Sequence, residues 1–296
     1  MNRLSADEPQ YLEWFEQEPK LTGLMLIRSP YSFKPAADGR HRLLLAVYDE
    51  EPGRRKTEYG MCERTRVEIC RISLDKLHQG IVSGDNPRLV QWLMQGTILL
   101  DRSGALAALL RKCSEWPPLL REQKLLCEFS RFLQTYLQAK QDLHNGQILD
   151  AYANILASLH HWAHIALVES GMHPELTVWE QMRRVNPGIY KLYEELTTSA
   201  ESVEQRVQLV LLACEFSVMT KMKSSCALLV RLLASRPVPW TVAELQRHPD
   251  LAGFPADLPL LLQKLAHRGV VREMVRPSPR GSRLIELQYS ADPGAV

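Results

Sequence analysis

The sequence predicts an α+β protein of three parts, with a small mixed-sheet domain first, a helical bundle next and a C-terminal winged helix last. Short apolar runs that suit buried strands alternate with helical segments over residues 1–116. Apolar residues then recur at intervals of three and four over residues 117–236, as in helices that pack together. Residues 237–296 have the order helix, helix, strand, turn and strand. A chain of 296 residues is also long for one core, which agrees with several domains.

The composition is that of an ordinary globular protein. The chain is 45% hydrophobic and 24% charged, and its formal net charge of +2 is too small to predict a strongly basic or acidic binding surface. Its first residues are polar and acidic, unlike a secretory signal, and no apolar run approaches the roughly 20 residues that span a bilayer. The six cysteines form no C-x-x-C pair, which favours buried free thiols. We therefore expect a soluble, cytoplasmic protein with no membrane partner.

The first domain is expected to alternate strands and helices. Ser5 and Glu8 form the capping box of a first helix. The run Leu21–Ile27 predicts a buried strand, and a loop rich in proline, glycine and serine follows it. The prolines after Trp116 end the domain, because consecutive prolines cannot continue a helix. Further strands are expected at residues 43–48, 58–61, 66–72 and 98–100, and further helices at 74–84, 87–96 and 104–113.

The bundle is organised around a helical run from Asp150 to Trp179, which Gly171 interrupts. Downstream, Ser202 and Gln205 form a capping box that opens a long helix. Because an isolated amphipathic helix is marginal in water, we expect the apolar stripes of these helices to be buried against one another. The stripes are Tyr152, Leu156, Leu159, Ala163 and Leu167 in the central run, Leu125, Phe129, Phe132, Leu133 and Tyr136 upstream, and Leu209, Leu212, Phe216 and Met219 downstream.

The C-terminal segment has the order of a winged helix-turn-helix. Thr241 and Asp257 begin its two helices, and alternating strands at 270–275 and 284–289 flank a turn. Such modules bind nucleic acid or serve as packing and dimer contacts, and both roles stay open here. Its candidates for contacts with a nucleic-acid backbone are Arg276, Arg280 and Arg283.

The order of elements also carries a family resemblance. A strand, a loop with Ser29, two further strands and the segment QWLMQGTILLDRSGALAALLRK are similar to a nucleotidyltransferase domain. The helical segment that follows resembles bacterial nucleotidyltransferase-like proteins, which join this domain to a helical substrate-binding-like domain and a C-terminal helix-turn-helix. The resemblance implies domains at 1–116, 117–236 and 237–296. It also implies a nucleotide or other phosphorylated ligand, held in a cleft between the first two domains.

The resemblance also says where catalytic groups would lie. An active member would carry Gly-Ser after the first strand, a pair of carboxylates at the start of the second and a third carboxylate on the next, because Mg²⁺ prefers oxygen ligands. This chain has Arg28-Ser29 at the first place and Arg40-His41-Arg42 at the second, and only Glu68 can stand for the third carboxylate. Cations at carboxylate positions repel a metal ion. We therefore expect a catalytically degenerate protein without a metal site. An active nucleotidyltransferase acting on a small molecule, with Mg²⁺ as cofactor, is one alternative, and a DNA-binding regulator is another.

Basic side chains supply the candidate ligand site. Guanidinium groups bind phosphate oxygens bidentately, and the resemblance places one bundle lysine toward the nucleotide. A solvated basic loop and a plain surface lysine are the alternatives. The candidates are Arg28, Ser29, Arg40, Arg42 and Lys140.

Histidines and aromatic residues of the bundle are interpreted as packing. His160 and His164 have the spacing of two metal ligands on a helix, with His161 beside them, but the sequence HHWAH lacks the glutamate of H-E-x-x-H. We expect these histidines to flank the apolar seam and not to bind a metal. Trp162, Trp179, Tyr190 and Tyr193 are expected to pack in the core and at helix contacts.

Overall fold

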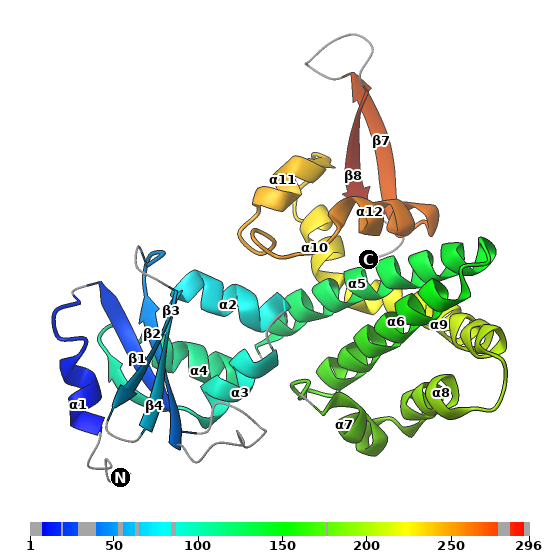
Figure 1. Cartoon of the computed structure of the whole chain (residues 1–296). Helices are drawn as coiled ribbons and strands as arrows, with labels where there is room; N and C mark the ends of the chain where they lie inside the picture. The colour runs from blue at the N-terminus through cyan, green and yellow to red at the C-terminus, as the bar shows by residue number, and fades with distance from the viewer. Residues whose placement is uncertain are drawn as a thin grey trace. The chain divides into compact units, whose positions relative to one another are not determined.

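A computed structural model describes residues 8–18, 20–28, 40–52, 56–62, 65–83, 87–115, 117–175, 177–277 and 285–292. The chain divides into two compact units, Met1–Pro117 and Pro118–Val296 (Figure 1). The first combines a sheet with short helices, and the second combines long helices with a small sheet. This mixture confirms the predicted α+β fold class.

The first unit is built on a five-stranded mixed sheet with the strand order β3-β4-β2-β1-β5. The two central strands, β1 and β2, are almost wholly buried, as expected for apolar runs in a sheet covered on both faces. β1 runs antiparallel to β2 and β5, β2 runs parallel to β4, and β3 forms an antiparallel edge. The strands are β1 (Leu21–Ile27), β2 (Arg40–Tyr48), β3 (Thr57–Cys62), β4 (Thr65–Ser73) and β5 (Thr97–Asp101).

Helices cover both faces of this sheet (Figure 1). α1 packs on one face through Tyr11 and Phe15, which join a cluster with Leu24 and Leu44 of the central strands. The other face carries α2, α3 and α4, and Gly23 of β1 allows α4 to approach closely. These helices are α1 (Glu8–Glu13), α2 (Leu74–Ser83), α3 (Pro87–Gln95) and α4 (Ala105–Glu115). The elements agree with the sequence-based expectation to within a few residues, while the Ser5 end of the first capping box lies outside the described residues.

The second unit centres on a hairpin of two long helices, α5 (Pro118–His144) and α6 (Ile148–Glu169). Gly146 joins them with a positive φ of 74°, a conformation that glycine adopts without strain. The predicted stripe of α5, from Leu125 to Tyr136, is buried. α7 (Val178–Val185), α8 (Pro187–Thr198) and α9 (Val203–Ser225) pack on α6.

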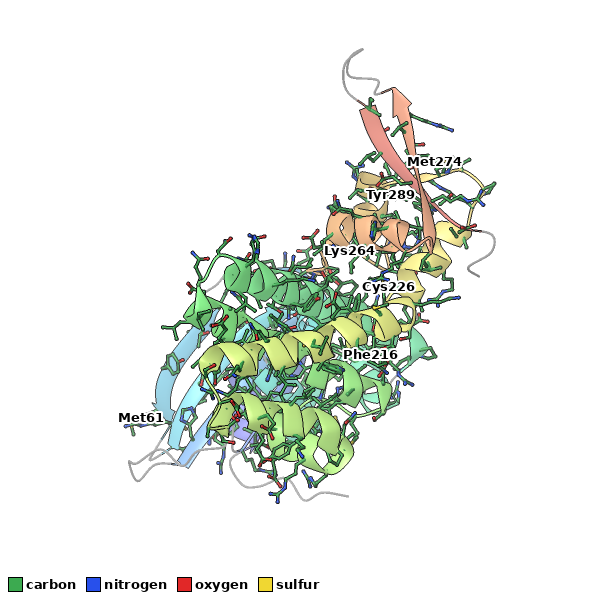
Figure 2. All side chains as sticks on the ribbon, turned by 90° about the vertical axis from the view of Figure 1, so that its right-hand side faces the viewer. Met61, Phe216, Cys226, Lys264, Met274 and Tyr289 are labelled. Carbon is green, nitrogen blue, oxygen red and sulfur yellow. The ribbon has the colours of Figure 1, made fainter. Side chains whose placement is uncertain are left out.

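One predicted stripe is wrong. Leu209, Leu212, Phe216 and Met219 of α9 are 49%, 69%, 70% and 55% exposed, and Figure 2 labels Phe216. The buried face of this helix instead consists of Val207, Val210, Leu211, Cys214 and Val218. Both sets recur at three- and four-residue intervals, so periodicity could not decide between them. The predicted capping box of α9 is confirmed, because Gln205 N donates to Ser202 Oγ at 3.3 Å and Ser202 N donates to Gln205 Oε1 at 3.1 Å.

The C-terminal part of the second unit has a three-stranded sheet in the order β6-β8-β7. The backbone N–H of Asp257 donates to Ser130 Oγ of α5 at 2.8 Å, and Gln123 of α5 donates to the Asp250 carbonyl at 3.0 Å. The predicted caps at Thr241 and Asp257 are both formed. The elements are α10 (Ala227–Ala234), β6 (Trp240–Thr241), α11 (Val242–Arg247), α12 (Leu258–His267), β7 (Val271–Pro277) and β8 (Ile285–Ala291).

The winged-helix interpretation of this C-terminal part stays a prediction. α11, α12, β7 and β8 follow the order helix, helix, strand and strand on which that interpretation was made, and α10 and the short strand β6 precede them. Over the parts of the chain that the structure describes, no helix combines the length and the apolar character needed to cross a membrane.

We expect Gly96→Ala to destabilise the first unit. A Cβ at this position would lie 2.6 Å from Met25 Cε and 2.8 Å from the Trp92 carbonyl oxygen, a backbone atom that already accepts the Gly96 N–H. Such overpacking costs about 1 to 3 kcal/mol of the free energy of unfolding. Gly60→Ala on the edge strand β3 is the matched control, because a Cβ added there would meet no atom of the described residues within 4 Å. Urea denaturation that gave both variants the same midpoint would contradict this account of Gly96.

Candidate functional site

The candidate phosphate ligands of the first unit lie where β1 ends and β2 begins. Ile27 pairs with Leu43, so the residue after β1 is next to Arg42. Arg42 Nη1 donates to the backbone carbonyl of Arg28 at 2.9 Å and to that of His41 at 3.2 Å. These bonds hold one guanidinium beside the backbone that carries a second, exposed arginine.

For two of the predicted ligands, Arg40 and Ser29, the structure describes no side chain. Arg40 is the first residue of β2, and its backbone pairs with Thr65 of β4. Ser29 and the loop up to residue 39 lie outside the described residues. The three basic residues that the sequence places before the apolar run therefore extend β2 instead of preceding it.

Glu68, the candidate third carboxylate, lies on the opposite face of the sheet from Arg42. In the parallel register of β2 and β4, Leu43 pairs with Glu68 and Arg42 pairs with Val67. Successive residues of a strand point to opposite faces, so Glu68 shares a face with His41, the middle residue of the expected carboxylate positions, and not with Arg42.

The Glu68 carboxylate has partners on its own face. Its Oε2 lies 3.6 Å from His41 Nε2, and its Oε1 accepts from the Tyr59 hydroxyl at 3.3 Å. The negative charge of Glu68 raises the pKa of Tyr59. The geometry therefore gives Glu68 a role in joining β2, β3 and β4, with His41 as its neighbour at the expected carboxylate positions.

Lys140 and Arg276 both lie in the second unit. Lys140 Nζ of α5 lies 3.5 Å from Glu215 Oε1 of α9, and both side chains are exposed. Arg276 of β7 is the register partner of Glu286 of β8. Arg280 and Arg283 lie outside the described residues. Neither Lys140 nor Arg276 is brought by the described structure into a cluster of cations.

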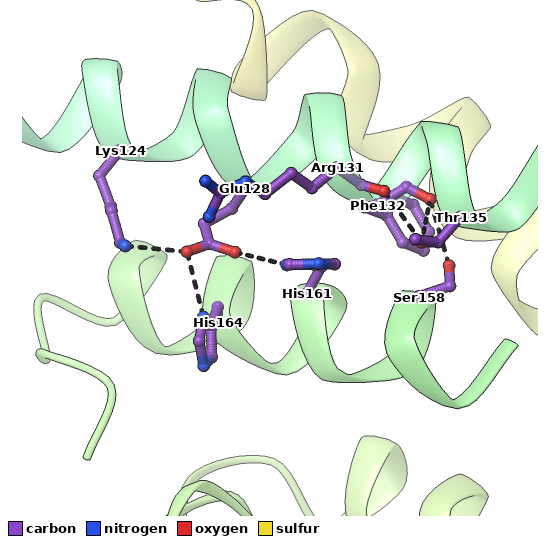
Figure 3. Close-up of polar contacts among 8 residues, drawn as sticks. All are labelled: Lys124, Glu128, Arg131, Phe132, Thr135, Ser158, His161 and His164. Atoms are coloured by element: carbon purple, nitrogen blue, oxygen red, sulfur yellow. Dashed lines mark hydrogen bonds and ion pairs between the residues drawn. The ribbon is translucent and has the colours of Figure 1, made fainter. Parts of the chain in front are cut away.

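A polar cluster that the sequence did not predict lies inside the bundle (Figure 3). Glu128 of α5 is 1% exposed. Its Oε1 lies 2.8 Å from Lys124 Nζ and 3.1 Å from His164 Nδ1, and its Oε2 lies 2.8 Å from His161 Nδ1. Burial by itself raises the pKa of the Glu128 carboxyl, but Lys124 and the two histidine hydrogen bonds outweigh it, so this pKa lies well below its usual range. Glu128 is therefore a buried anion, compensated mainly by Lys124.

The ligand atoms of Glu128, His161 and His164 lie within 4.8 Å of one another, which is close enough to consider a metal ion. Lys124 argues against one. Its ammonium group lies against the same carboxylate oxygen that a metal would use, and a divalent cation there would be repelled. The chemistry of this group therefore fits a buried ion pair that orients two imidazoles better than it fits a metal site.

Glu128 could have been found from the sequence. It follows Lys124 by four residues, the spacing of an ion pair on one helical face. It also lies next to Phe129, in the middle of a stripe that was predicted to be buried. A charged residue in such a stripe requires a partner, and three histidines on the facing helix were the available ones.

His160 lies beside this cluster, and burial keeps it neutral. Its ring centroid is 4.4 Å from that of His164 and 6.0 Å from that of Trp179. Burial lowers the pKa of His160 to about 4, and the neighbouring His164 and His161 lower it in the same direction.

We expect His160 to make the protein less stable as the pH falls from about 6.5 towards about 4. Over this range the unfolded chain binds a proton at this imidazole and the native chain does not, so acid favours unfolding. His160→Gln removes the difference and should flatten the loss of stability between about pH 7 and about pH 5, measured by urea denaturation. The depressed pKa of Glu128 does not interfere, since its stabilisation is lost only below about 4.5.

His144→Gln is the matched control, because His144 lies exposed in the last turn of α5. The control should keep the wild-type dependence on pH. A dependence that is the same in wild type and in both variants would show that the native state binds a proton at His160 as readily as the unfolded chain does.

Comparisons with known proteins agree with this architecture. The profile described as nucleotidyltransferase-like matches residues 5–121, and the profile described as YgxA-like substrate binding domain matches residues 122–221. The chain is 32% identical over 223 residues to the uncharacterized protein YgxA of Bacillus subtilis (strain 168), covering 75% of each protein. It is also similar to the crystal structure of a nucleotidyltransferase-like protein from Exiguobacterium sibiricum 255-15, with a TM-score of 0.81, 27% identity and coverage of 97% of this chain and 98% of that one. The chain therefore belongs to the family of nucleotidyltransferase-like proteins that carry a YgxA-like substrate binding domain.

Proposed function

We propose that the protein binds a nucleotide or another phosphorylated small molecule through its first unit and does not transfer the nucleotidyl group. The observation that carries this proposal is the pair of arginines at the junction of β1 and β2. Arg42 donates to the carbonyl of Arg28, so both residues meet where the resemblance expects phosphate and metal to be held. Guanidinium groups bind phosphate oxygens directly, with good geometry and without a metal.

The surroundings of Glu68 support the second half of the proposal. Phosphoryl transfer by metal ions requires carboxylates that converge on the same ions. Glu68 faces away from Arg42 and lies against His41 and Tyr59. The arginines would replace part of the positive charge that Mg²⁺ supplies in an active member, which favours a ligand free of metal.

A nucleoside triphosphate should therefore raise the melting temperature of the protein without Mg²⁺. Ligand that binds only the native state stabilises it by about 2.7 kcal/mol at a hundred times the dissociation constant. We expect ATP, GTP, CTP or UTP in excess EDTA to raise the melting temperature, and Arg28→Ala with Arg42→Ala to abolish the rise. The measurement is differential scanning fluorimetry across the four nucleotides, with and without Mg²⁺.

The matched control is Lys56→Ala, because this exposed cation of the same unit pairs with Glu51 and lies away from the arginines in sequence. Lys140→Ala is measured separately, to determine whether the bundle lysine contributes to the rise in melting temperature caused by the nucleotide. A nucleotide response that survives in the double arginine variant would move the phosphate site elsewhere. A response that requires Mg²⁺ would argue for a retained metal site.

Nucleotidyl transfer itself should be undetectable. We expect labelled nucleoside triphosphates incubated with Mg²⁺ or Mn²⁺, together with hydroxyl- and amine-bearing acceptors, to leave the label untransferred, because cations occupy the expected carboxylate positions. Thin-layer separation of the products measures this. Sustained metal-dependent turnover that Glu68→Gln abolishes would contradict the proposal that the protein does not transfer the nucleotidyl group.

A further inference from the structure

A pocket of about 380 Å³ opens between α6, α7 and α8 of the second unit. Its size falls within the range of small-molecule sites, which run from about 300 to about 1,000 Å³. The side chains that define it are Leu156, Ala157, His160 and His161 of α6, Trp179 of α7 and Tyr193 of α8. All of these elements lie within the second unit and within the span that matches a substrate binding domain.

One wall of the pocket is aromatic. The rings of Trp179 and Tyr193 are stacked, with centroids 3.9 Å apart and an angle of 11° between their planes. The break between α7 and α8 permits this stack, because Asn186 ends the first helix and caps the second by accepting from Ile189 N at 3.2 Å. Because each ring covers one face of the other, the pair offers a ligand its outer ring faces and its ring edges, and a planar ring can pack on either.

The pocket also has one imidazole of fixed orientation. His161 Nδ1 lies 2.8 Å from Glu128 Oε2, and an ionised carboxylate can only accept, so Nδ1 carries the proton. The other ring nitrogen, Nε2, is then the acceptor in the neutral ring. Buried Glu128 cannot turn to release His161, since Lys124 and His164 hold its second oxygen. A lining residue with its tautomer fixed in this way is suited to recognising a ligand that donates a hydrogen bond.

Among the residues that the structure describes, the lining includes no lysine, arginine, aspartate or glutamate, so it offers no charged partner to a phosphate or carboxylate. The chemistry of the lining instead combines an aromatic wall, aliphatic side chains and an imidazole whose Nε2 accepts when the ring is neutral. We propose that this pocket binds an uncharged, planar heteroaromatic ring, which packs on the outer face or the edges of the Trp179–Tyr193 pair and donates an N–H hydrogen bond to Nε2 of the neutral His161. The proposal is independent of the phosphate site, because it uses other residues and a ligand group without charge.

Three uncharged compounds test this, namely indole, adenosine and guanosine, added to the full-length protein and followed by saturation-transfer NMR and titration. At least one should bind with a dissociation constant below about 1 mM. Methylating the ring N–H, as in 1-methylindole and 1-methylguanosine, should weaken binding about tenfold, because a lost hydrogen bond leaves the acceptor unpaired. If none of the three compounds binds, or if the methylated forms bind equally well, the proposal is wrong.

Two variants locate the binding. Ala157→Phe should fill the pocket and Tyr193→Leu should remove half of the stacked wall, and each should weaken binding about tenfold or more. The matched control is Ala200→Phe, at an exposed position before α9, and it should bind as wild type does. Cooperative melting of each variant verifies that it folds. Binding that is unchanged in both pocket variants would overturn the proposal.

A last comparison separates this pocket from the phosphate site. Adenosine and guanosine binding should survive Arg28→Ala with Arg42→Ala, the pair of changes expected to abolish the response to triphosphates. If the two arginine changes remove nucleoside binding as well, the compounds bind at the arginines and not in this pocket.

Discussion

The bundle depends on one buried charge. Glu128 lies between α5 and α6, where an unpaired carboxylate would cost several kcal/mol, so its compensation fixes how the two helices meet. Lys124 supplies the opposite charge from the same helix, while His161 and His164 supply hydrogen bonds from the facing one. A sliding of α6 along α5 by one turn would break both histidine contacts. The position of His161 in the pocket is therefore set by electrostatic contacts inside the bundle. α7 and α8 supply the aromatic residues of the same pocket, Trp179 and Tyr193.

In the first unit, the alternation of side chains along the strands determines which candidate residues share a face of the sheet. A metal site of this fold needs carboxylates from neighbouring strands on a single face. The parallel register of β2 and β4 puts Glu68 with Leu43, whereas Arg42 lies with Val67 on the face that α1 covers. The presence of Arg40, His41 and Arg42 where carboxylates are expected is thus the reason for expecting ligand binding without transfer, because the residue of that segment on the face of Glu68 is a histidine.

Most of the fold could be predicted from local patterns. The apolar runs gave the central strands, and the capping residues Ser202, Thr241 and Asp257 located three helix starts that the structure confirms. Local patterns could not choose the buried face of α9, because its apolar residues surround the helix. They also missed the role of HHWAH, since the partner of its histidines lies more than thirty residues away on another helix. Strand register, which separates Glu68 from Arg42, likewise comes from pairing over long distances and not from either strand alone.

The exposed stripe of α9 has a consequence for the thermodynamics of unfolding. Leu209, Leu212, Phe216 and Met219 already contact water in the folded chain as the structure describes it. Unfolding therefore adds less new hydration at these side chains than at fully buried ones, and hydration of newly exposed apolar surface is what raises the heat capacity. α9 should contribute less to the heat-capacity change than its apolar composition suggests. The contribution of α9 to the heat-capacity change comes mainly from its narrower buried face, which carries Val207, Val210, Cys214 and Val218. A smaller heat-capacity change makes the free energy of unfolding of the protein curve less with temperature.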